Sequence, residues 1–469
     1  MAEISFHGAA GTVTGSCHLL RTGDRKILLD AGAFQGPWAV ESLNYKSFGF
    51  DPQEIHSLIL SHGHLDHCGR IPLLANHGFR ASIYCTYPTR DIAHFILMDS
   101  AHILKEEFIW RQKRLIRAGI KAEEPLYTFD DVYYSMDLFD RPVRLHERVE
   151  LGDGVSVMFH ASEAGHILGS AQVYIDYPGK KGKKKRLLFT GDLGDGDRPL
   201  VNDPESPERP VDVLIMESTY GNREHRSYEE SVQELEEAIE STVKHGGTVL
   251  IPTFALERSQ ELLYHIGNMK RAGKLSAKIP VFLNSPLAID ITRLYQKYCS
   301  YCHKELMVGY GKGESPFTFP GLHFTQTADE SKAIHTVEGP KIVLAGSGMM
   351  TGGRIKHHLK HLLWKESTTL IIVGYQAEGS LGRKIVDGAD TVKIFGQPVS
   401  VKARVYTING FSAHADRTHL LEFARRTKPR KIFVVHGEPV SSSALAEELS
   451  RELKNTEIHI PKLGQKFRI

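Results

Sequence analysis

Apolar and polar residues alternate in short runs over the first 200 residues, and most runs end at a glycine or another turn-forming residue. A period of two is typical of strands that bury one face. The runs that predict strands are ISFHGA, CHLLRTG, RKILLDAG, SLILSH, ASIYCTY, VSVMFHA, AQVYIDYP and KRLLFTGD. Residues 89–118 instead place apolar residues at helical spacing. The pattern predicts a mixed, β-rich sheet structure flanked by helices.

The pattern changes after a segment rich in proline and aspartate at 194–210. Beyond it, apolar strands lead into helices through short loops, at 248–266, 279–298, 341–363 and 368–388. Such repeated units favour right-handed βαβ crossovers and a parallel sheet. We therefore predict a second α/β domain.

After residue 398 the chain returns to strands and short helices, and histidines reappear. If these histidines join the N-terminal ones at one site, the α/β domain is an insertion. We therefore expect a first domain formed by residues 1–209 and 398–469, with an inserted domain over residues 210–397.

Charge and composition exclude several classes of protein. The 469 residues include 58 Lys plus Arg and 56 Asp plus Glu, a net charge of +2, so any nucleic-acid surface must be local. No apolar run of about 18 residues and no signal-like start is found, which predicts a cytoplasmic protein without a membrane partner. The 5 cysteines are scattered, so we expect them to be reduced and structural.

The candidate chemistry starts at the sequence HGHLDH, residues 62–67, directly after the apolar run SLILS. Side chains at i and i+2 project to the same side of an extended chain, so His62 and His64 can bind one ion. Asp66 and His67 can then bind a neighbouring ion. Imidazole and carboxylate ligands suit zinc, and two ions about 3.5–4 Å apart are a common device for hydrolysis. The motif predicts two Zn²⁺ per chain.

HGHLDH resembles the HxHxDH signature of the metallo-β-lactamase fold superfamily, and the rest of that pattern is present. Asp30, His166 and Asp192 follow predicted strands in the family's order. The resemblance implies an αββα sandwich. It also implies ligand roles: His62, His64 and His166 on one zinc, Asp66 and His67 on the other, Asp192 bridging the two, and Asp30 orienting a ligand.

Three later motifs resemble those of the β-CASP nucleases, namely MESTYG with Glu217, FSAHAD with His414 and VVHGE with His436. The likeness covers essentially the whole chain and makes the inserted segment a β-CASP cap domain on a parallel sheet. It is closest to the RNA-processing branch, which includes the endonuclease subunit of the cleavage and polyadenylation specificity factor and its bacterial and archaeal relatives.

This resemblance implies that His436 completes the second zinc site. It also implies that His414 contacts the scissile phosphate or protonates the leaving oxygen, and that Glu217 orients His414. A histidine at position 436 favours RNA, because the DNA-repair branch typically has an apolar residue there.

The chemistry is coherent with hydrolysis of single-stranded RNA. A water bound by two zinc ions has a pKa of ~7, and the hydroxide that it forms is a ready nucleophile. Attack on phosphorus with protonation of the departing 3′ oxygen leaves a 5′-phosphate and a 3′-hydroxyl. We expect an endonuclease, because the C-terminal extension of the exonucleolytic branch is not found, and leave 5′-to-3′ trimming open. The alternatives are a dinuclear zinc hydrolase of small esters or lactones and an inactive RNA-processing scaffold.

A basic run and two glycine-rich loops are further candidates for contact with RNA. The basic run GKKGKKKR at 179–186 is either a solvated hairpin tip or a phosphate-attracting patch. Glycine-rich loops at 346–354 and 374–383 can present N–H groups to phosphates. No GK[ST] follows them, so no nucleotide cofactor is expected. The candidate RNA contacts in these loops are Ser347, Arg354, Ser380 and Arg383.

Overall fold

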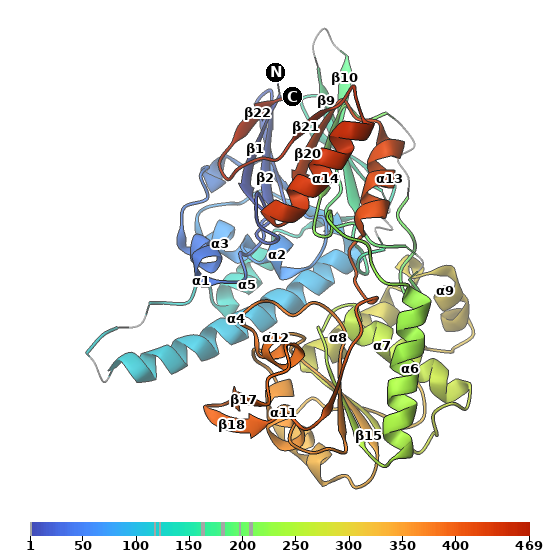
Figure 1. Cartoon of the computed structure of the whole chain (residues 1–469). Helices are drawn as coiled ribbons and strands as arrows, with labels where there is room; N and C mark the ends of the chain where they lie inside the picture. The colour runs from blue at the N-terminus through green and yellow to red at the C-terminus, as the bar shows by residue number, and fades with distance from the viewer. Residues whose placement is uncertain are drawn as a thin grey trace. The chain divides into compact units, whose positions relative to one another are not determined.

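A computed structural model describes residues 2–116, 119–121, 123–160, 165–179, 183–196, 198–205 and 210–469. The chain divides into two compact units (Figure 1). The first consists of Met1–Glu224 and Ala413–Ile469, and the second of His225–Ser412. These boundaries lie later than the expected ones at 209/210 and 397/398, because strand β11 (Val213–Glu217) is hydrogen-bonded inside a sheet of the first unit.

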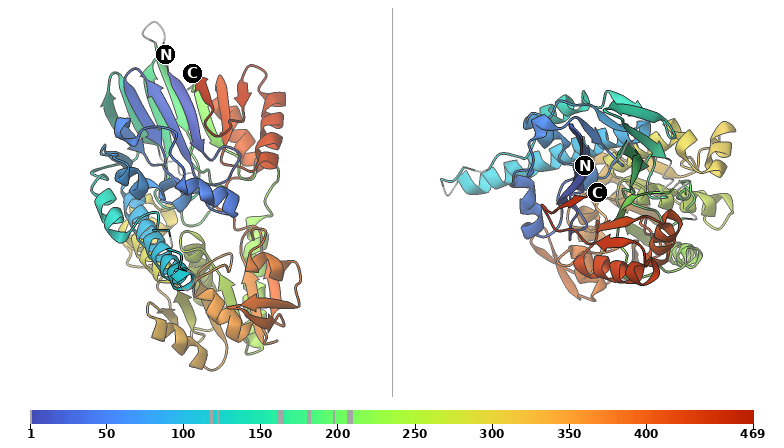
Figure 2. Two further views of the ribbon diagram at one scale, coloured as in Figure 1. Left: turned by 90° about the vertical axis from the view of Figure 1, so that its left-hand side faces the viewer. Right: turned by 90° about the horizontal axis from the view of Figure 1, so that it is seen from above.

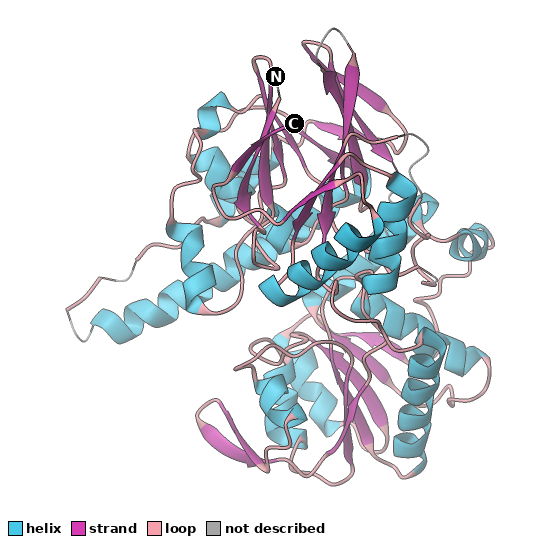
Figure 3. Ribbon diagram, turned by 45° about the horizontal axis from the view of Figure 1, so that its top comes forward, coloured by secondary structure: helices cyan, strands magenta, loops and turns pink. Residues whose placement is uncertain are grey.

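Among the described residues, the first unit contains two seven-stranded sheets (Figures 2 and 3). One has the order β22 (Lys466–Arg468), β1 (Glu3–Gly8), β2 (Cys17–Thr22), β3 (Arg25–Leu29), β4 (Ser57–Ile59), β5 (Ile83–Thr86), β6 (Arg141–Val143). The other has the order β21 (Glu457–His459), β20 (Lys431–Val435), β11, β10 (Lys184–Phe189), β9 (Gln172–Pro178), β8 (Val155–His160), β7 (Arg148–Gly152).

The two sheets pack face to face because alternate residues of their strands are apolar. Val173 and Ile175 of β9 lie in the core between the sheets, together with Leu20 and Ile27 of the other sheet. The intervening Tyr174 lies in a different core, on the outer face. This is the period of two that the sequence showed, with both faces of each sheet covered.

Helices cover the outer faces. On one side are α2 (Leu65–Cys68), α3 (Ile71–Asn76), α4 (Tyr87–Leu115) and α5 (Phe129–Met136), and on the other α13 (Arg417–Thr427) and α14 (Pro439–Glu452). A short α1 (Trp38–Glu41) and the 3₁₀ helices η1 (Ser42–Tyr45) and η2 (Pro52–Glu54) follow β3. The predicted αββα sandwich is confirmed, and α4 is the helix expected at 89–118.

The second unit is built on a parallel sheet, as predicted. The strand order is β14 (Leu322–Phe324), β13 (Val281–Asn284), β15 (Lys341–Ala345), β12 (Thr248–Pro252), β16 (Thr368–Ile372), β19 (Arg404–Thr407), and β17 (Thr391–Ile394) with β18 (Gln397–Ser400) forms a hairpin. The helical elements are α6 (Tyr228–Lys244), α7 (Arg258–Arg271), α8 (Pro286–Lys297), η5 (Cys299–Tyr301), α9 (Lys304–Gly311), α10 (Ala328–Ala333), η6 (Ile334–Thr336), α11 (Ile355–Leu362) and α12 (Leu381–Val386).

The structure also describes the state of the cysteines and the character of the helices. All 5 cysteines are free thiols, as expected. Within the described ranges, no helix combines the length and the apolar character that a membrane crossing requires.

Candidate metal centre

Strand ends of the first unit place the predicted site residues. Asp30 follows β3, the segment 62–67 follows β4, Asp192 follows β10, and His436 follows β20, while Glu217 is the last residue of β11. Within each sheet the strands that end at these residues are parallel neighbours. Their carboxyl ends therefore meet at one edge, where α/β structures commonly hold their sites.

The first group of candidate ligands combines His62, His64, His166 and Asp192, whose ligand atoms all lie within 4.8 Å of one another. His64 Nδ1 lies 3.1 Å from His62 Nε2 and 3.0 Å from His166 Nε2. Asp192 Oδ2 lies 3.4 Å from His62 Nε2 and 3.3 Å from His166 Nε2. The side chains that the resemblance assigned to one zinc thus converge.

The second group combines Asp66, His67 and His436. His436 Nε2 lies 3.2 Å from His67 Nε2 and 3.4 Å from Asp66 Oδ2. Asp192 Oδ1 lies 3.3 Å from His67 Nε2. Asp192 therefore turns one oxygen toward each group, which is the position of a bridging ligand.

These donors fit two zinc ions. In a tetrahedral zinc site with bonds of about 2.0–2.1 Å, ligand atoms lie about 3.3 Å apart, close to the separations found within both groups. Asp192 is only 2% exposed, and its Oδ1 accepts no hydrogen bond from the described residues. A buried carboxylate oxygen that accepts no hydrogen bond is costly even with the His67 imidazole 3.3 Å away, and a cation at this position satisfies it.

Asp30 fixes the orientation of the second group. His67 Nδ1 donates a hydrogen bond of 2.7 Å to Asp30 Oδ2. Asp30 also accepts from Ser16 Oγ at 3.0 Å, and from Ser61 N at 2.8 Å and Ser61 Oγ at 3.0 Å. The φ of Asp30 is 58°, in the left-handed region, so its surroundings hold a backbone conformation that costs about 1–3 kcal/mol. With Nδ1 bonded, His67 turns Nε2 to the metal position.

The first group consists of neutral imidazoles. Burial lowers the pKa of His64 to about 3, and burial together with nearby imidazoles lowers the pKa values of His62 and His166. His166 Nδ1 donates to the carbonyl of Ala413 at 3.0 Å, which leaves Nε2 as the ligand atom. Neutral imidazole is the form that binds a metal ion.

The second group differs because its charges are paired. Burial opposes a charge on His67, yet the negative charges of Asp192 and Asp30 raise its pKa well above the ordinary value. Burial also opposes ionisation of Asp66, but the hydrogen bond with His436 and the charge of His67 hold the Asp66 pKa well below its usual range. A metal ion binding here displaces a proton, so its affinity falls as the pH falls.

His414 and Glu217 form a proton-bearing pair beside the ligands. His414 Nδ1 donates to Glu217 Oε1 at 3.1 Å and Oε2 at 3.2 Å, and it lies 3.9 Å from Asp192 Oδ2. Leu193 N and Thr219 N donate to Glu217 at 2.6 and 3.3 Å and hold the carboxylate in place. Burial lowers the pKa of His414, but the charge and hydrogen bond of Glu217 outweigh it and raise this pKa to about 10. The side chain is 22% exposed, so a protonated imidazole is within reach of a bound substrate.

Three further side chains support the site and were not predicted from the sequence. Ser61 Oγ lies 3.0 Å from His62 Nδ1, and Thr219 Oγ1 lies 3.2 Å from His436 Nδ1. Ser61 and Thr219 could have been found from their positions, because Ser61 directly precedes HGHLDH and Thr219 lies within MESTYG. Arg70 Nε donates to Gly32 O at 2.6 Å, and its guanidinium lies over the rings of Phe34 and Phe48. No motif indicated Arg70.

The predicted RNA contacts lie in the second unit, in the loops after β15 and β16. Ser347 Oγ accepts from Gly352 N at 3.3 Å, and Arg354 donates to the carbonyls of Thr325 and Gln326. Both loops follow strands of one parallel sheet and so lie at the same edge of this unit.

The other two predicted contacts are also bonded locally. Ser380 caps α12 by accepting from Arg383 N at 3.1 Å, and Arg383 Nε donates to Asp387 at 2.9 and 3.0 Å. RNA contact by these four residues stays a prediction.

The basic run 179–186 joins two antiparallel strands, β9 and β10. Its residues 180–182 lie outside the described residues. Arg186, at its end, donates Nε to Asp176 Oδ1 at 2.7 Å. A role of this run in RNA binding stays a prediction.

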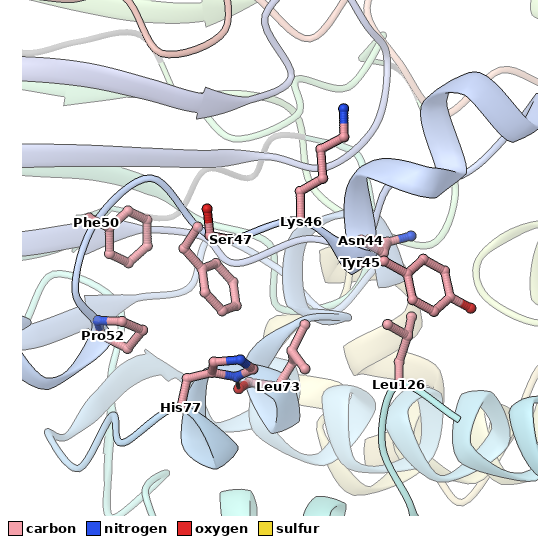
Figure 4. A pocket seen from close by; sticks show the side chains of 10 residues that line it. Asn44, Tyr45, Lys46, Ser47, Phe50, Pro52, Leu73, His77 and Leu126 are labelled. Atoms are coloured by element: carbon pink, nitrogen blue, oxygen red, sulfur yellow. Dashed lines mark hydrogen bonds between the residues drawn. The ribbon is translucent and has the colours of Figure 1, made fainter. Parts of the chain in front are cut away.

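A separate pocket of about 390 Å³ lies beside the loop that follows η1 (Figure 4). Its walls are mostly aromatic and aliphatic side chains, among them Tyr45, Phe48, Phe50 and Leu73. It shares no residue with the two ligand groups. None of the residues that line this pocket is a candidate metal ligand.

Comparison with known families agrees with this geometry. Residues 10–242 match the model of the metallo-beta-lactamase superfamily, residues 259–385 match the Beta-Casp domain, and residues 398–461 match the Zn-dependent metallo-hydrolase RNA specificity domain. A ribonuclease of Thermus thermophilus, TTHA0252, is 38% identical over 98% of both chains. The chain belongs to the β-CASP metallo-hydrolases. This confirms the family that the motifs indicated.

Other proteins that are similar to this β-CASP hydrolase carry different names. The transcription termination factor FttA of Methanocaldococcus jannaschii is 32% identical over 96% of this chain and 69% of its own. The endoribonuclease YSH1 of Eremothecium gossypii is 30% identical over 96% of this chain, which spans 57% of that relative. A crystal structure of a protein of unknown function from Enterococcus faecalis V583 shares the fold, with a TM-score of 0.56 at 15% identity over 99% of both chains.

Proposed function

We propose that this β-CASP hydrolase is a zinc-dependent ribonuclease that cleaves single-stranded RNA, mainly at internal phosphodiester bonds, and leaves a 5′-phosphate and a 3′-hydroxyl. The observation that carries the proposal is Asp192, which joins two histidine-rich ligand groups and lies 3.9 Å from His414. Relatives named ribonuclease and endoribonuclease, and the match to an RNA specificity domain, support RNA as the substrate.

The residues of the chain divide the work. His62, His64, His166 and Asp192 would hold one zinc ion, and Asp66, His67 and His436, with the other oxygen of Asp192, would hold the second. When bound, the two ions supply positive charge for the phosphoryl oxygens and a water with a pKa near ~7.

The proton for the leaving group comes from His414. Its Nδ1 is bonded to Glu217, so Nε2 is the nitrogen that gives a proton to the departing 3′ oxygen. Glu217 does not meet the substrate and is a positioning residue, because it fixes the imidazole and keeps it protonated. The carboxylate of Glu217 is itself fully buried.

The test is cleavage of 5′-labelled single-stranded RNA and DNA of one sequence by wild type, Asp192→Ala and the matched control Asp153→Ala. Asp153 is an exposed carboxylate that pairs with Arg25 and belongs to neither ligand group. We expect internal RNA fragments from wild type and Asp153→Ala, and a loss of about 10³-fold or more in Asp192→Ala. Bound zinc is counted in the same samples.

Each alternative predicts a different result. Release of mononucleotides from the 5′ end would replace the endonuclease by an exonuclease. Intact RNA with two zinc ions bound would favour small esters or lactones as substrates. Intact RNA without zinc would favour an RNA-processing scaffold.

A further inference from the structure

The C-terminal half of α4 leaves the core of the first unit. The buried residues of this helix end at Ala101, which packs with Ala93 and Leu97 in the outer core beside α3 and α5. From residue 102 to the end of the helix at Leu115, no residue is buried. This stretch of about 21 Å extends beyond the sheets of its own unit in two views (Figures 1 and 2).

We call residues 102–115 the α4 arm. One face of this arm is exposed and carries apolar and charged side chains in a regular order. At 100° per residue, six side chains fall within an arc of about 120°. They are Ile103, Glu106, Glu107, Trp110, Lys113 and Arg114, and all six are exposed. Ile103 is 49% and Trp110 is 62% exposed, so a large apolar surface stands between charged flanks.

The opposite side of the arm is partly covered. Leu104, Phe108, Arg111 and Leu115 repeat at i, i+4, i+7 and i+11, and all four are partly buried. Leu104 packs against the outer core. The exposed face is therefore the one that the fold leaves for another molecule.

On the exposed face, acidic side chains precede Trp110 and basic side chains follow it. Glu106 and Glu107 precede it by four and three residues, and Lys113 and Arg114 follow it by three and four. Glu106 and Lys113 lie on one flank of the face, and Glu107 and Arg114 lie on the other. The face is thus complementary to an antiparallel copy of itself.

In an antiparallel pair with a two-fold axis at Trp110, like flanks meet. Glu106 then lies opposite Lys113 of the partner subunit, and Glu107 lies opposite Arg114 of the partner subunit. The two tryptophans pack on the axis with Ile103 on either side, and the interface closes on itself. A parallel pair would place like charges opposite each other, which is destabilising.

The contacts inside the arm do not oppose this pairing. Glu107 forms an exposed ion pair of 3.5 Å with Arg111, and such a pair contributes little to stability. Arg114 lies over the ring of Trp110, 5.6 Å from its centroid, a contact that a paired arm can keep.

We propose that the exposed face of the α4 arm is a self-association surface that binds α4 of a second copy of this chain. Two arms of about four turns form a small interface, below the roughly 1,600 Å² of a standard stable complex. The dimer therefore forms and dissociates in the micromolar range. It is a property beyond RNA hydrolysis, and its test does not need the active site.

The test is sedimentation velocity between about 1 and 100 μM, the range in which a micromolar dimer dissociates. The charge-reversal variants are Glu106→Lys/Glu107→Arg, whose exposed face carries only basic charges, and Lys113→Glu/Arg114→Glu, whose exposed face carries only acidic charges. We expect wild type to dimerise with concentration, each variant alone to stay monomeric, and their equimolar mixture to form a dimer. The control is Glu237→Lys/Glu240→Arg on the exposed side of α6, which has the same change in charge and should dimerise like wild type.

The mixing step makes the proposal falsifiable even if one variant loses stability, because restored dimerisation requires two folded arms. A wild type that stays monomeric at all concentrations would overturn the proposal. Variants that dimerise like wild type, or a mixture that stays monomeric, would overturn it as well. A monomeric wild type whose Lys113→Glu/Arg114→Glu variant binds single-stranded RNA more weakly would assign the face to RNA.

Discussion

Three imidazoles of the metal centre are fixed by a hydrogen bond on the nitrogen that faces away from it. His67 donates to Asp30 at 2.7 Å, His166 to the carbonyl of Ala413 at 3.0 Å, and His414 to Glu217 at 3.1 Å. Each acceptor sets the tautomer and the ring orientation. In the proposed function, the same chemical group would thus serve twice as a metal ligand and once as a proton donor, depending on its partner.

The role of His414 can be separated from metal binding. We expect His414→Ala to slow RNA cleavage about 10²- to 10⁴-fold, because the leaving 3′ oxygen then departs without a proton. In an RNA with a 3′-bridging sulfur at the cleaved bond, the leaving group departs as a thiolate and needs no such proton. The variant should cleave this substrate at close to the wild-type rate.

The control for this experiment is Asp192→Ala, which should cleave neither substrate. If the sulfur substrate is as slow as normal RNA in His414→Ala while zinc remains bound, then His414 is not the proton donor.

The Asp30 carboxylate should govern the affinity of one zinc ion. Asp30→Asn keeps the size of the side chain but removes the charge that His67 faces, so zinc affinity should fall about 10- to 100-fold. Competition with a chromogenic chelator measures it, with Asp153→Asn as the exposed control. Equal affinities of the two variants would show that Asp30 does not act on the ligand.

At the scale of elements, two loops of the first unit bring His414 to the ligands. Ala415 N donates to Leu193 O at 2.7 Å, and Asp416 N donates to Asp195 at 3.1 Å. His419, in the first turn of α13, contacts both Asp195 and Asp416 at 3.1 and 3.0 Å. These contacts tie the loop after β10 to the loop before α13, which holds His414.

The His419 contacts predict a pH-dependent contribution to stability. Hydrogen bonds to Asp195 and Asp416 raise the pKa of His419 to about 10 in the folded protein, above the ordinary 6.5. Their contribution is therefore complete below pH 6.5 and is lost as the pH rises through 10. Since the His419 side chain is half exposed, the contribution of these contacts to the free energy of unfolding is about 1 kcal/mol or less.

A double-mutant cycle with His419→Ala and Asp195→Asn, followed by urea unfolding at several pH values, measures this contribution. The coupling free energy should be constant up to neutral pH and vanish above pH 10. A coupling that grows with pH would contradict the assignment of the charge.

At the scale of the molecule, the C-terminal segment completes the first unit. β20 pairs with β11 inside one sheet, and β22 pairs with β1 in the other. The loop after β20 delivers His436, whose φ of 51° is also left-handed. The segment that begins at Ala413 therefore supplies strands of both sheets together with His414 and the candidate ligand His436.

Zinc removal should destabilise the first unit selectively. All the ligand clusters found among the described residues lie in this unit, and a ligand in about 1,000-fold excess over its Kd adds about 4 kcal/mol of stability. In differential scanning calorimetry, chelation should lower the transition of the first unit, and added zinc should restore it. The transition of the second unit, which has its own core, should stay unchanged. Equal shifts of both would contradict the prediction.

Much of the fold and the site was predictable because the signals are local. The period of two in AQVYIDYP and the helical spacing after residue 89 depend on neighbours within a few residues, and the structure has β9 and α4 there. The domain boundary was placed too early because the proline-rich segment precedes β11, whose partner β20 lies more than 200 residues later. Arg70 was missed because its hydrogen bond to Gly32 O, which is distant in the sequence, leaves no periodic signal.

The sequence by itself determined the types of ligand, their attachment to strand ends and the α/β pattern of the insertion, because side-chain chemistry and backbone period are properties of short segments. Only the tertiary structure decided that Asp192 turns one oxygen to each ligand group and that His414 meets Glu217. It also decided that half of α4 stays outside the core. These outcomes depend on which strands pair and which faces pack, and packing is settled by contacts across the whole chain rather than within any one segment.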